Sequence, residues 1–269
     1  MRFGLSVANF GTYAEPARVV ELAAAAEASG WDGLFLWDHL SFAWGPDAGD
    51  PWILLAAVAH ATERLRLGTH VTPVPRRRPH VLAVTVATLD RLSGGRVVFG
   101  AGLGGNEREF AAFGDETDER VRGAMLDEAL EILRQLWAGE EVRQRGDHYV
   151  VDGVRLGALP LQRPLPIWIG GNAPRPLRRA ARYDGWAANS SYIDRMTLDP
   201  GDVAARLETI RGVRGDLAGF DVVVQGLSDL ADPSAYAATG ATWWLENVHD
   251  LRGPFEAQLE LVRSGPPAD

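Results

Sequence analysis

The sequence contains no cysteine and no lysine, so all 27 of its basic residues are arginines. Without cysteine, the chain cannot form disulfides, thiolate metal sites or a cysteine nucleophile. Without lysine, it cannot form a Schiff base, bind pyridoxal phosphate covalently or build a Walker A phosphate loop. Any anion that this protein binds must therefore be held by arginine, by backbone N–H groups or by hydroxyls.

The net charge of −9 argues against general nucleic-acid binding, which requires a basic surface that neutralises phosphates. No apolar run reaches the length of about 18 residues that a membrane span needs. The first residues also lack the apolar core of a signal peptide. We therefore expect a cytoplasmic protein that acts on a small molecule and has no nucleic-acid or membrane partner.

Short apolar segments alternate with amphipathic segments along the whole chain. Strands are predicted at 3–7, 34–37, 65–71, 96–101, 166–169, 185–189, 220–224 and 241–245, and helices at 16–29, 51–62, 80–92, 120–138, 174–183, 202–214, 233–238 and 253–262. Eight strand–helix units in about 250 residues predict a (β/α)₈ TIM barrel. We expect one domain over residues 1–269, with a small polar insertion at about 140–161, between the fourth helix and the fifth strand.

The carboxyl ends of the predicted strands define the candidate site, because TIM barrels place their chemistry there. His39 follows the second strand, and Glu107 lies in the loop after the fourth. An imidazole and a carboxylate on one rim can serve as base and acid. The alternatives are a His39 that caps its strand beside Asp38, and a Glu107 that the helix dipole favours in a first helical turn.

Glycines mark two further strand ends. Gly100, Gly102 and Gly105 match the G-x-G-x-x-G spacing, but no acidic residue follows at a second strand end about 20 residues later, as a dinucleotide site requires. We interpret these glycines as a surface on which a flat ring lies against the backbone. The turn at residues 170–172 precedes a helix and predicts a phosphate site, to which Arg175 would add charge.

Arginines, histidines and aromatic residues complete the candidate rim. Residues 76–78 are three consecutive arginines that form either a solvated turn or a clamp for an acidic tail. The six histidines lack the spacing of metal ligands, so we predict no metal site. We expect barrel packing from Phe35, Trp37, Trp243 and Trp244, and apolar pocket walls from Phe42, Trp44 and Tyr192.

Several motifs together resemble the bacterial luciferase-like superfamily of flavin- and deazaflavin-dependent oxidoreductases. They lie at residues 3–5, 26–32, 37–40, 67–73, 89–96, 102–110 and 166–171, so the resemblance covers nearly the whole chain. Trp37-Asp38-His39-Leu40 and Asn106-Glu107 are most similar to the F420-dependent branch. The resemblance implies a TIM barrel that binds F420, with FMN as the alternative, and it implies a homodimer.

The resemblance also assigns roles to residues. The hydride-carrying ring would rest on a bulge after the third strand, with a non-prolyl cis peptide at His70–Val71. His39 would be a base beside the substrate, and Glu107 matches the corresponding acid after a small shift in the loop. The cofactor-binding residues would be Asp38, His70, Val71, Thr72, Gly102, Asn106, Gly170, Gly171, Asn172 and Arg175.

Departures from the pattern bear on the substrate. The sugar-phosphate dehydrogenases of this branch bind phosphate with lysines, and one of those positions is Tyr192 here. We therefore expect hydride transfer between the deazaflavin and a small organic substrate that is not a sugar phosphate. An FMN-dependent monooxygenase and a non-catalytic flavin-binding protein are the alternatives, and a cofactor-free barrel lyase is disfavoured by the missing lysine.

Overall fold

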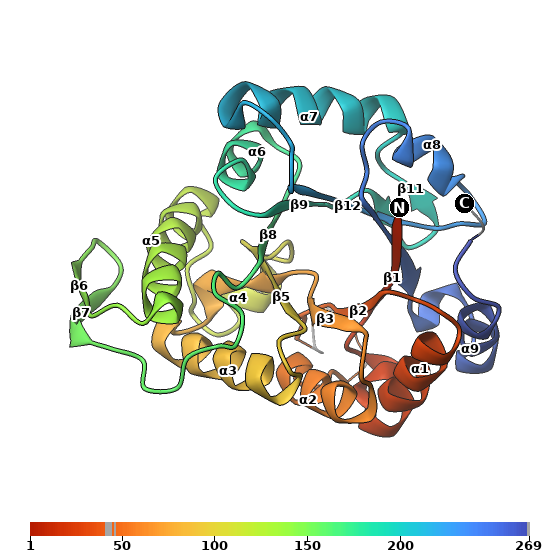
Figure 1. Cartoon of the computed structure of the whole chain (residues 1–269), viewed down its shortest axis with the longest axis horizontal. Helices are drawn as coiled ribbons and strands as arrows, with labels where there is room; N and C mark the ends of the chain where they lie inside the picture. The colour runs from red at the N-terminus through yellow and green to blue at the C-terminus, as the bar shows by residue number, and fades with distance from the viewer. Residues whose placement is uncertain (41–44, 46, 268–269) are drawn as a thin grey trace.

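The computed structural model describes residues 1–40, 45 and 47–267. Eight parallel strands form a ring, as Figure 1 shows. They are β1 (Arg2–Val7), β2 (Gly33–Leu36), β3 (Arg66–Thr69), β5 (Val97–Gly102), β8 (Ile167–Gly170), β9 (Gly185–Ala188), β12 (Asp221–Gly226) and β13 (Trp243–Val248). The ring closes because β1 pairs with β13 in parallel, from Arg2 opposite Trp243 to Val7 opposite Val248. The predicted TIM barrel is confirmed.

Helices surround the barrel (Figure 1). They are α1 (Pro16–Ala28), α2 (Pro51–Ala61), α3 (Pro79–Leu92), α4 (Arg108–Ala111), α5 (Glu119–Ala138), α6 (Pro174–Ala180), α7 (Pro200–Arg214), α8 (Pro233–Ala237) and α9 (Phe255–Arg263), with short 3₁₀ turns at Gly11–Ala14, Val74–Arg76 and Asp250–Arg252. Many of them begin with proline, whose fixed φ and missing N–H suit the first helical position. In α5 the predicted apolar face is buried at Leu126, Leu130 and Leu133.

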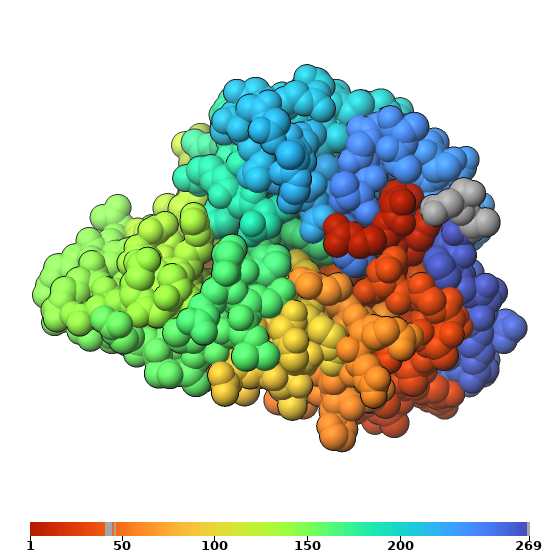
Figure 2. Space-filling model, in the orientation of Figure 1, coloured from red at the N-terminus to blue at the C-terminus, as the bar shows by residue number. Residues whose placement is uncertain are grey.

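The predicted insertion is an antiparallel hairpin of β6 (Val142–Arg145) and β7 (Val150–Val154). It lies outside the ring of helices and protrudes beyond α5 at the left of Figure 2. The Glu128 carboxylate of α5 accepts hydrogen bonds from the backbone N–H groups of residues 147, 148 and 149, each at 3.1 Å. A second hairpin, β10 (Ser191–Tyr192) with β11 (Arg195–Met196), is not predicted by the sequence pattern.

Large side chains fill the interior of the barrel. Phe35, Trp168 and Trp243 pack together, with ring centroids 4.9 to 5.8 Å apart. Phe35 and Trp243 thus pack as expected, while Trp244 is buried against Tyr236 of α8. Trp37 differs from expectation, because it lines a cavity above this packed interior. The solid core leaves the carboxyl ends of the strands as the place for a site.

The third strand ends earlier than predicted. β3 stops at Thr69, and the next peptide bond, His70–Val71, is cis. The chain then resumes pairing at β4 (Thr72–Pro73), which lies beside the end of β5. The cis peptide stands where the resemblance implied it, and both of its residues, His70 and Val71, line the cavity.

Candidate active site

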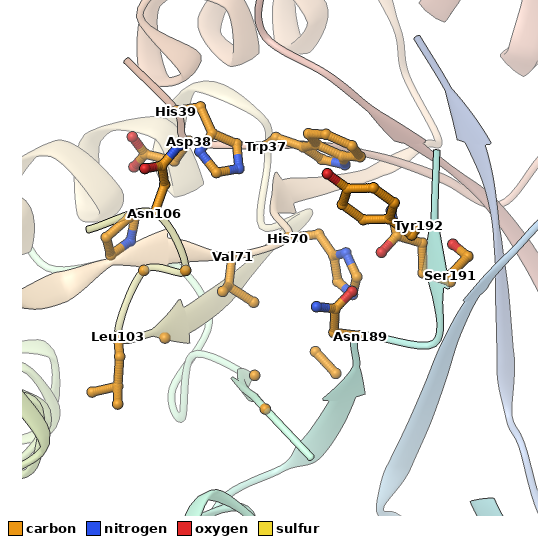
Figure 3. A pocket seen from close by; sticks show the side chains of 18 of the residues that line it. Trp37, Asp38, His39, His70, Val71, Leu103, Asn106, Asn189, Ser191 and Tyr192 are labelled. Atoms are coloured by element: carbon orange, nitrogen blue, oxygen red, sulfur yellow. The ribbon is translucent and has the colours of Figure 1, made fainter. Parts of the chain in front are cut away.

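A cavity of about 600 Å³ opens at the carboxyl ends of the barrel strands. This volume lies within the range of about 300 to 1,000 Å³ that is usual for small-molecule sites. Figure 3 shows His39, Trp37 and Tyr192 around the hollow, together with His70 and Val71. Tyr192 is therefore a wall of the cavity, as expected, whereas Phe42 and Trp44 lie outside the described residues.

An imidazole–carboxylate pair lies at the cavity, but its acid is not the predicted one. His39 Nδ1 lies 2.9 Å from Glu109 Oε1, and the Leu40 N–H donates to the same oxygen at 2.9 Å. Glu109 is fully buried, whereas Glu107 is exposed at the cavity wall. The two acids are two residues apart at the start of α4. The turn of this short helix directs only the second of them inward, so Glu109 replaces Glu107 as the partner of His39.

The environment of Glu109 favours the carboxylate form. Burial alone would raise the pKa of the Glu109 carboxyl, but hydrogen bonds from His39 and Leu40 and the charge of Arg76 lower it below its usual value. Arg76 donates to Glu109 Oε2 at 2.7 Å. An ionised carboxylate only accepts hydrogen bonds, so the His39 proton belongs on Nδ1. In the neutral ring the lone pair is then on Nε2.

Asp38 forms ion pairs with the arginines of the following loop. Arg77 NH2 contacts both carboxylate oxygens of Asp38 at 2.8 Å, and Arg76 NH2 contacts Oδ1 at 3.1 Å. Arg76 and Arg77 thus form ion pairs with acidic side chains of the same chain. This role differs from both predicted alternatives, a solvated turn and a clamp for an acidic tail. Arg78 is exposed. Asp38 lines the cavity as predicted, but the residue is only 3% exposed.

The bulge after β3, at residues 70 and 71, packs against glycines of two neighbouring strands. A Cβ atom on Gly102 would lie 2.5 Å from Val71 Cγ2, and one on Gly170 would lie 3.0 Å from the same atom. Such distances exclude larger residues unless Val71 moves. Val71 therefore occupies space left by two bare strand ends and presents an apolar surface to the cavity. Thr72, by contrast, is fully buried and donates to the hydroxyl of Thr69, so it does not line the cavity.

The predicted phosphate turn reaches the cavity only in part. Gly170 and Gly171 line it; Gly171 has φ +116°, and a Cβ added to it would lie 2.9 Å from Pro176 Cβ. The Asn172 side chain donates to the Asn189 carbonyl at 2.7 Å instead. Arg175 is exposed on α6 and is not part of the cavity wall. Of the other predicted residues, His70, Gly102 and Asn106 all line the cavity.

Four polar wall residues were not among the predicted site residues. Asn189 and Ser191 follow β9, Gln225 lies near the end of β12, and His249 follows β13. Ser191 and Gln225 lie at predicted carboxyl ends of strands, so the TIM-barrel rule includes them among the candidates. The rule does not distinguish the residues that contact a ligand from the other residues at these ends. His249 was assigned outside the strand because the last strand was predicted to end at 245, whereas β13 continues to Val248.

The described residues contain no group of three His, Asp or Glu side chains that could hold a metal ion. In the same part of the chain, no helix has the length and apolarity needed to cross a membrane.

The fold and the site define a TIM-barrel protein with a ligand cavity at the carboxyl ends of its strands. The profile of the luciferase-like monooxygenase family matches residues 1–264. The chain therefore belongs to this family.

Two curated relatives are named as F420-dependent dehydrogenases. The chain is 37% identical to an F420-dependent glucose-6-phosphate dehydrogenase of Nakamurella multipartita over 208 residues, which are 74% of this chain and 59% of the relative. It is 34% identical to an F420-dependent hydroxymycolic acid dehydrogenase of Mycobacterium tuberculosis, over 90% of this chain and 67% of the relative. The chain thus spans less than two thirds of the length of the first of these relatives.

Solved structures share the fold. The F420-dependent tetrahydromethanopterin reductase of Methanopyrus kandleri superposes with a TM-score of 0.77 at 20% identity, with 97% of each chain covered. A monooxygenase of Streptomyces bottropensis superposes with the same TM-score at 23% identity, over 98% of this chain and 97% of the other. At these identities the likeness shows the barrel alone.

Proposed function

We propose that this protein is an F420-dependent oxidoreductase that transfers hydride between the deazaflavin and a small organic substrate. The observation that carries the proposal is the meeting of two features in one cavity: the His39–Glu109 pair and the Val71 surface. The F420-dependent names of the curated relatives support the choice of cofactor.

The cavity fits a flat ring system. Val71 offers an apolar surface, and the glycines at 102, 170 and 171 leave backbone bare around it. His70 adds two buried ring nitrogens that lack a hydrogen-bond partner within the described part of the chain. These residues, with Asp38 and Asn106, would hold the cofactor. When bound there, F420 supplies a two-electron hydride acceptor or donor.

His39 handles the proton that accompanies hydride transfer. Oxidation of an alcohol carbon releases a hydride from carbon and a proton from the hydroxyl. With its proton on Nδ1 held by the Glu109 carboxylate, His39 takes the hydroxyl proton on Nε2 and becomes an imidazolium. The Glu109 charge stabilises that cation, as in other oriented histidine–carboxylate pairs.

The test is a comparison of His39→Ala with His148→Ala, a change in the insertion hairpin outside the cavity. Turnover is measured with purified F420 and a panel of alcohols, and cofactor affinity is measured by fluorescence titration. A loss of turnover of about 100-fold or more with little change in affinity is expected for His39→Ala, as for removal of a general base. Equal losses in both quantities would assign His39 a positional role instead.

FMN-dependent oxygenation is the second candidate, because barrels of monooxygenases superpose equally well. A flavin-binding protein without turnover is the third, and retention of His39 and Glu109 argues against it. Oxygen consumption with reduced FMN, in the absence of F420 activity, would favour the second candidate.

We also propose that the protein is a homodimer through α2 and α3. Apolar side chains are exposed on these neighbouring helices: Ile53 is 68% exposed, Val81 55%, Val84 53% and Leu92 52%. Exposed apolar patches of this kind mark interaction surfaces. Light scattering is expected to report a dimer for the wild type and a monomer for Val84→Asp. A monomeric wild type would contradict the proposal.

A further inference from the structure

His249 is a buried imidazole at the wall of the cavity. It follows β13 directly, is fully buried, and lies with its ring centroid 5.9 Å from that of Trp37. Neither ring nitrogen has a hydrogen-bond partner among the described residues. Buried polar groups are nearly always paired, so an unpaired ring at a cavity wall points to a group that arrives with a ligand.

Hydrogen bonds link the ends of the three neighbouring strands that lead to Ser191, Gln225 and His249. The Ser190 hydroxyl donates to the Gln225 carbonyl at 2.7 Å, which joins the end of β9 to β12. The Gln225 side chain donates to Asn247 Oδ1 at 2.9 Å, which joins β12 to β13 two residues before His249. Ser191, which lines the same cavity, has a buried hydroxyl that also lacks a partner in the described part of the chain.

His249 and the residues Ser191 and Gln225 of the same cavity carry no net charge at neutral pH. Burial, together with the charge of Arg252, lowers the pKa of His249 from its ordinary value of 6.5 to about 4. Arg252 itself is bound to Glu246 and to the Asn247 carbonyl. A neutral imidazole has one donor and one acceptor nitrogen, so it can bind a hydroxyl through either or a carbonyl through its N–H.

The cavity offers little to an anion. Among the residues that the structure describes, no arginine lines it, and the nearby Arg76 and Arg77 are paired with Asp38 and Glu109. The ionisable groups of the wall are two acids, three histidines and a tyrosine. A phosphate or carboxylate on the substrate would therefore lose its hydration without gaining a cation.

We propose that His249, with Ser191 in the same cavity, binds an uncharged hydroxyl or carbonyl group of the substrate. The substrate is accordingly a neutral alcohol or ketone with an apolar part, not a sugar phosphate. That this hydroxyl or carbonyl is the group that reacts rests on the proposed function. That His249 binds it does not depend on the proposed function.

The experiment compares the wild type with His249→Phe, which keeps an aromatic ring but cannot form the hydrogen bond. His60→Phe, a change on the outer face of α2, is the control. Two probes are used, cyclohexanone as the neutral one and glucose 6-phosphate as the anionic one. The first readout is the ¹⁵N NMR spectrum of histidine-labelled protein without cofactor, with the His249 signals assigned by their absence in His249→Phe.

The second readout is steady-state kinetics with F420 and cyclohexanol. We expect cyclohexanone to shift the His249 nitrogen signals and glucose 6-phosphate to leave them unchanged. In His249→Phe the KM for cyclohexanol is expected to rise about tenfold, the effect of one lost hydrogen bond, with cofactor affinity within about twofold of the wild type. His60→Phe is expected to match the wild type in both readouts.

Failure of the two proposals can be told apart. If F420 supports no turnover, the proposed function fails, and the NMR titration still decides the role of His249. If glucose 6-phosphate shifts the His249 signals and cyclohexanone does not, the inference is overturned. It is also overturned if cyclohexanone binds equally well to His249→Phe, whatever the enzyme's activity.

Discussion

Replacement of Gly102 by alanine tests the idea that the Val71 surface supports the cofactor. The new Cβ would lie 2.5 Å from Val71 Cγ2. Carbon atoms in contact normally lie about 3.5 to 4.0 Å apart, so Val71 must move by about 1 Å or more. Overpacking of this kind costs about 1 to 3 kcal/mol. If the displaced surface no longer meets the ring, the same free energy weakens cofactor binding by about 5- to 150-fold.

The assay is titration of each variant with F420, followed by thermal unfolding without cofactor. Gly105→Ala is the matched control, because Gly105 also lines the cavity and has no atom within 4 Å of its added Cβ. It should bind F420 like the wild type. Gly102→Ala should bind at least about fivefold more weakly and unfold about 2 to 10 °C lower, by the usual scaling for chains of about this size.

The double variant Gly102→Ala/Val71→Ala separates the contact from other effects. Shortening Val71 removes the atoms that clash, so the second change should restore part of the stability lost in the first, a coupling that a double-mutant cycle measures. Normal F420 affinity in Gly102→Ala, or losses that simply add in the double variant, would refute the reasoning.

Two further predictions concern ionisable groups. Glu109→Gln should lower turnover about tenfold or more, and Glu107→Gln should lower it less than about twofold, because only Glu109 contacts His39. Steady-state kinetics compare the two variants. Equal losses of turnover would contradict the His39–Glu109 pairing. Burial lowers the pKa of His70 and of His249 to about 4. Between about pH 4 and 6.5 the unfolded chain therefore binds more protons than the folded chain, so the free energy of unfolding decreases as the pH falls. From pH 7 to pH 5 the decrease is about 2 kcal/mol for each histidine. Urea unfolding at both pH values should show His249→Phe losing less stability than the wild type, and an equal loss would count against a buried neutral ring.

The barrel could be predicted from sequence because its cause is local. A strand covered on both faces is an apolar run, and most of the helices carry their own start signal, such as Pro16 or Asp118. The rim position of His39 followed from the same pattern. These features depend on neighbours within one strand–helix unit, which a sequence displays directly.

The pairings within the site could not be predicted, because they join loops from different units. Glu109 binds His39 across 70 positions of sequence, and Arg77 binds Asp38 across 39. The spacing of Glu107 and Glu109 does not reveal which acid the short α4 turns inward. His249 was missed for a similar reason: a strand end misplaced by three residues moves a side chain off the rim.

The central claim is that the cavity binds F420. Its most direct test is a side-by-side titration of the purified wild-type protein with F420 and with FMN, in which tryptophan fluorescence reports binding. Trp37 lies in the cavity wall, so a bound ring should quench it. The account predicts saturable, micromolar or tighter binding of F420 and weaker binding of FMN. Micromolar binding of FMN with no binding of F420 would contradict it.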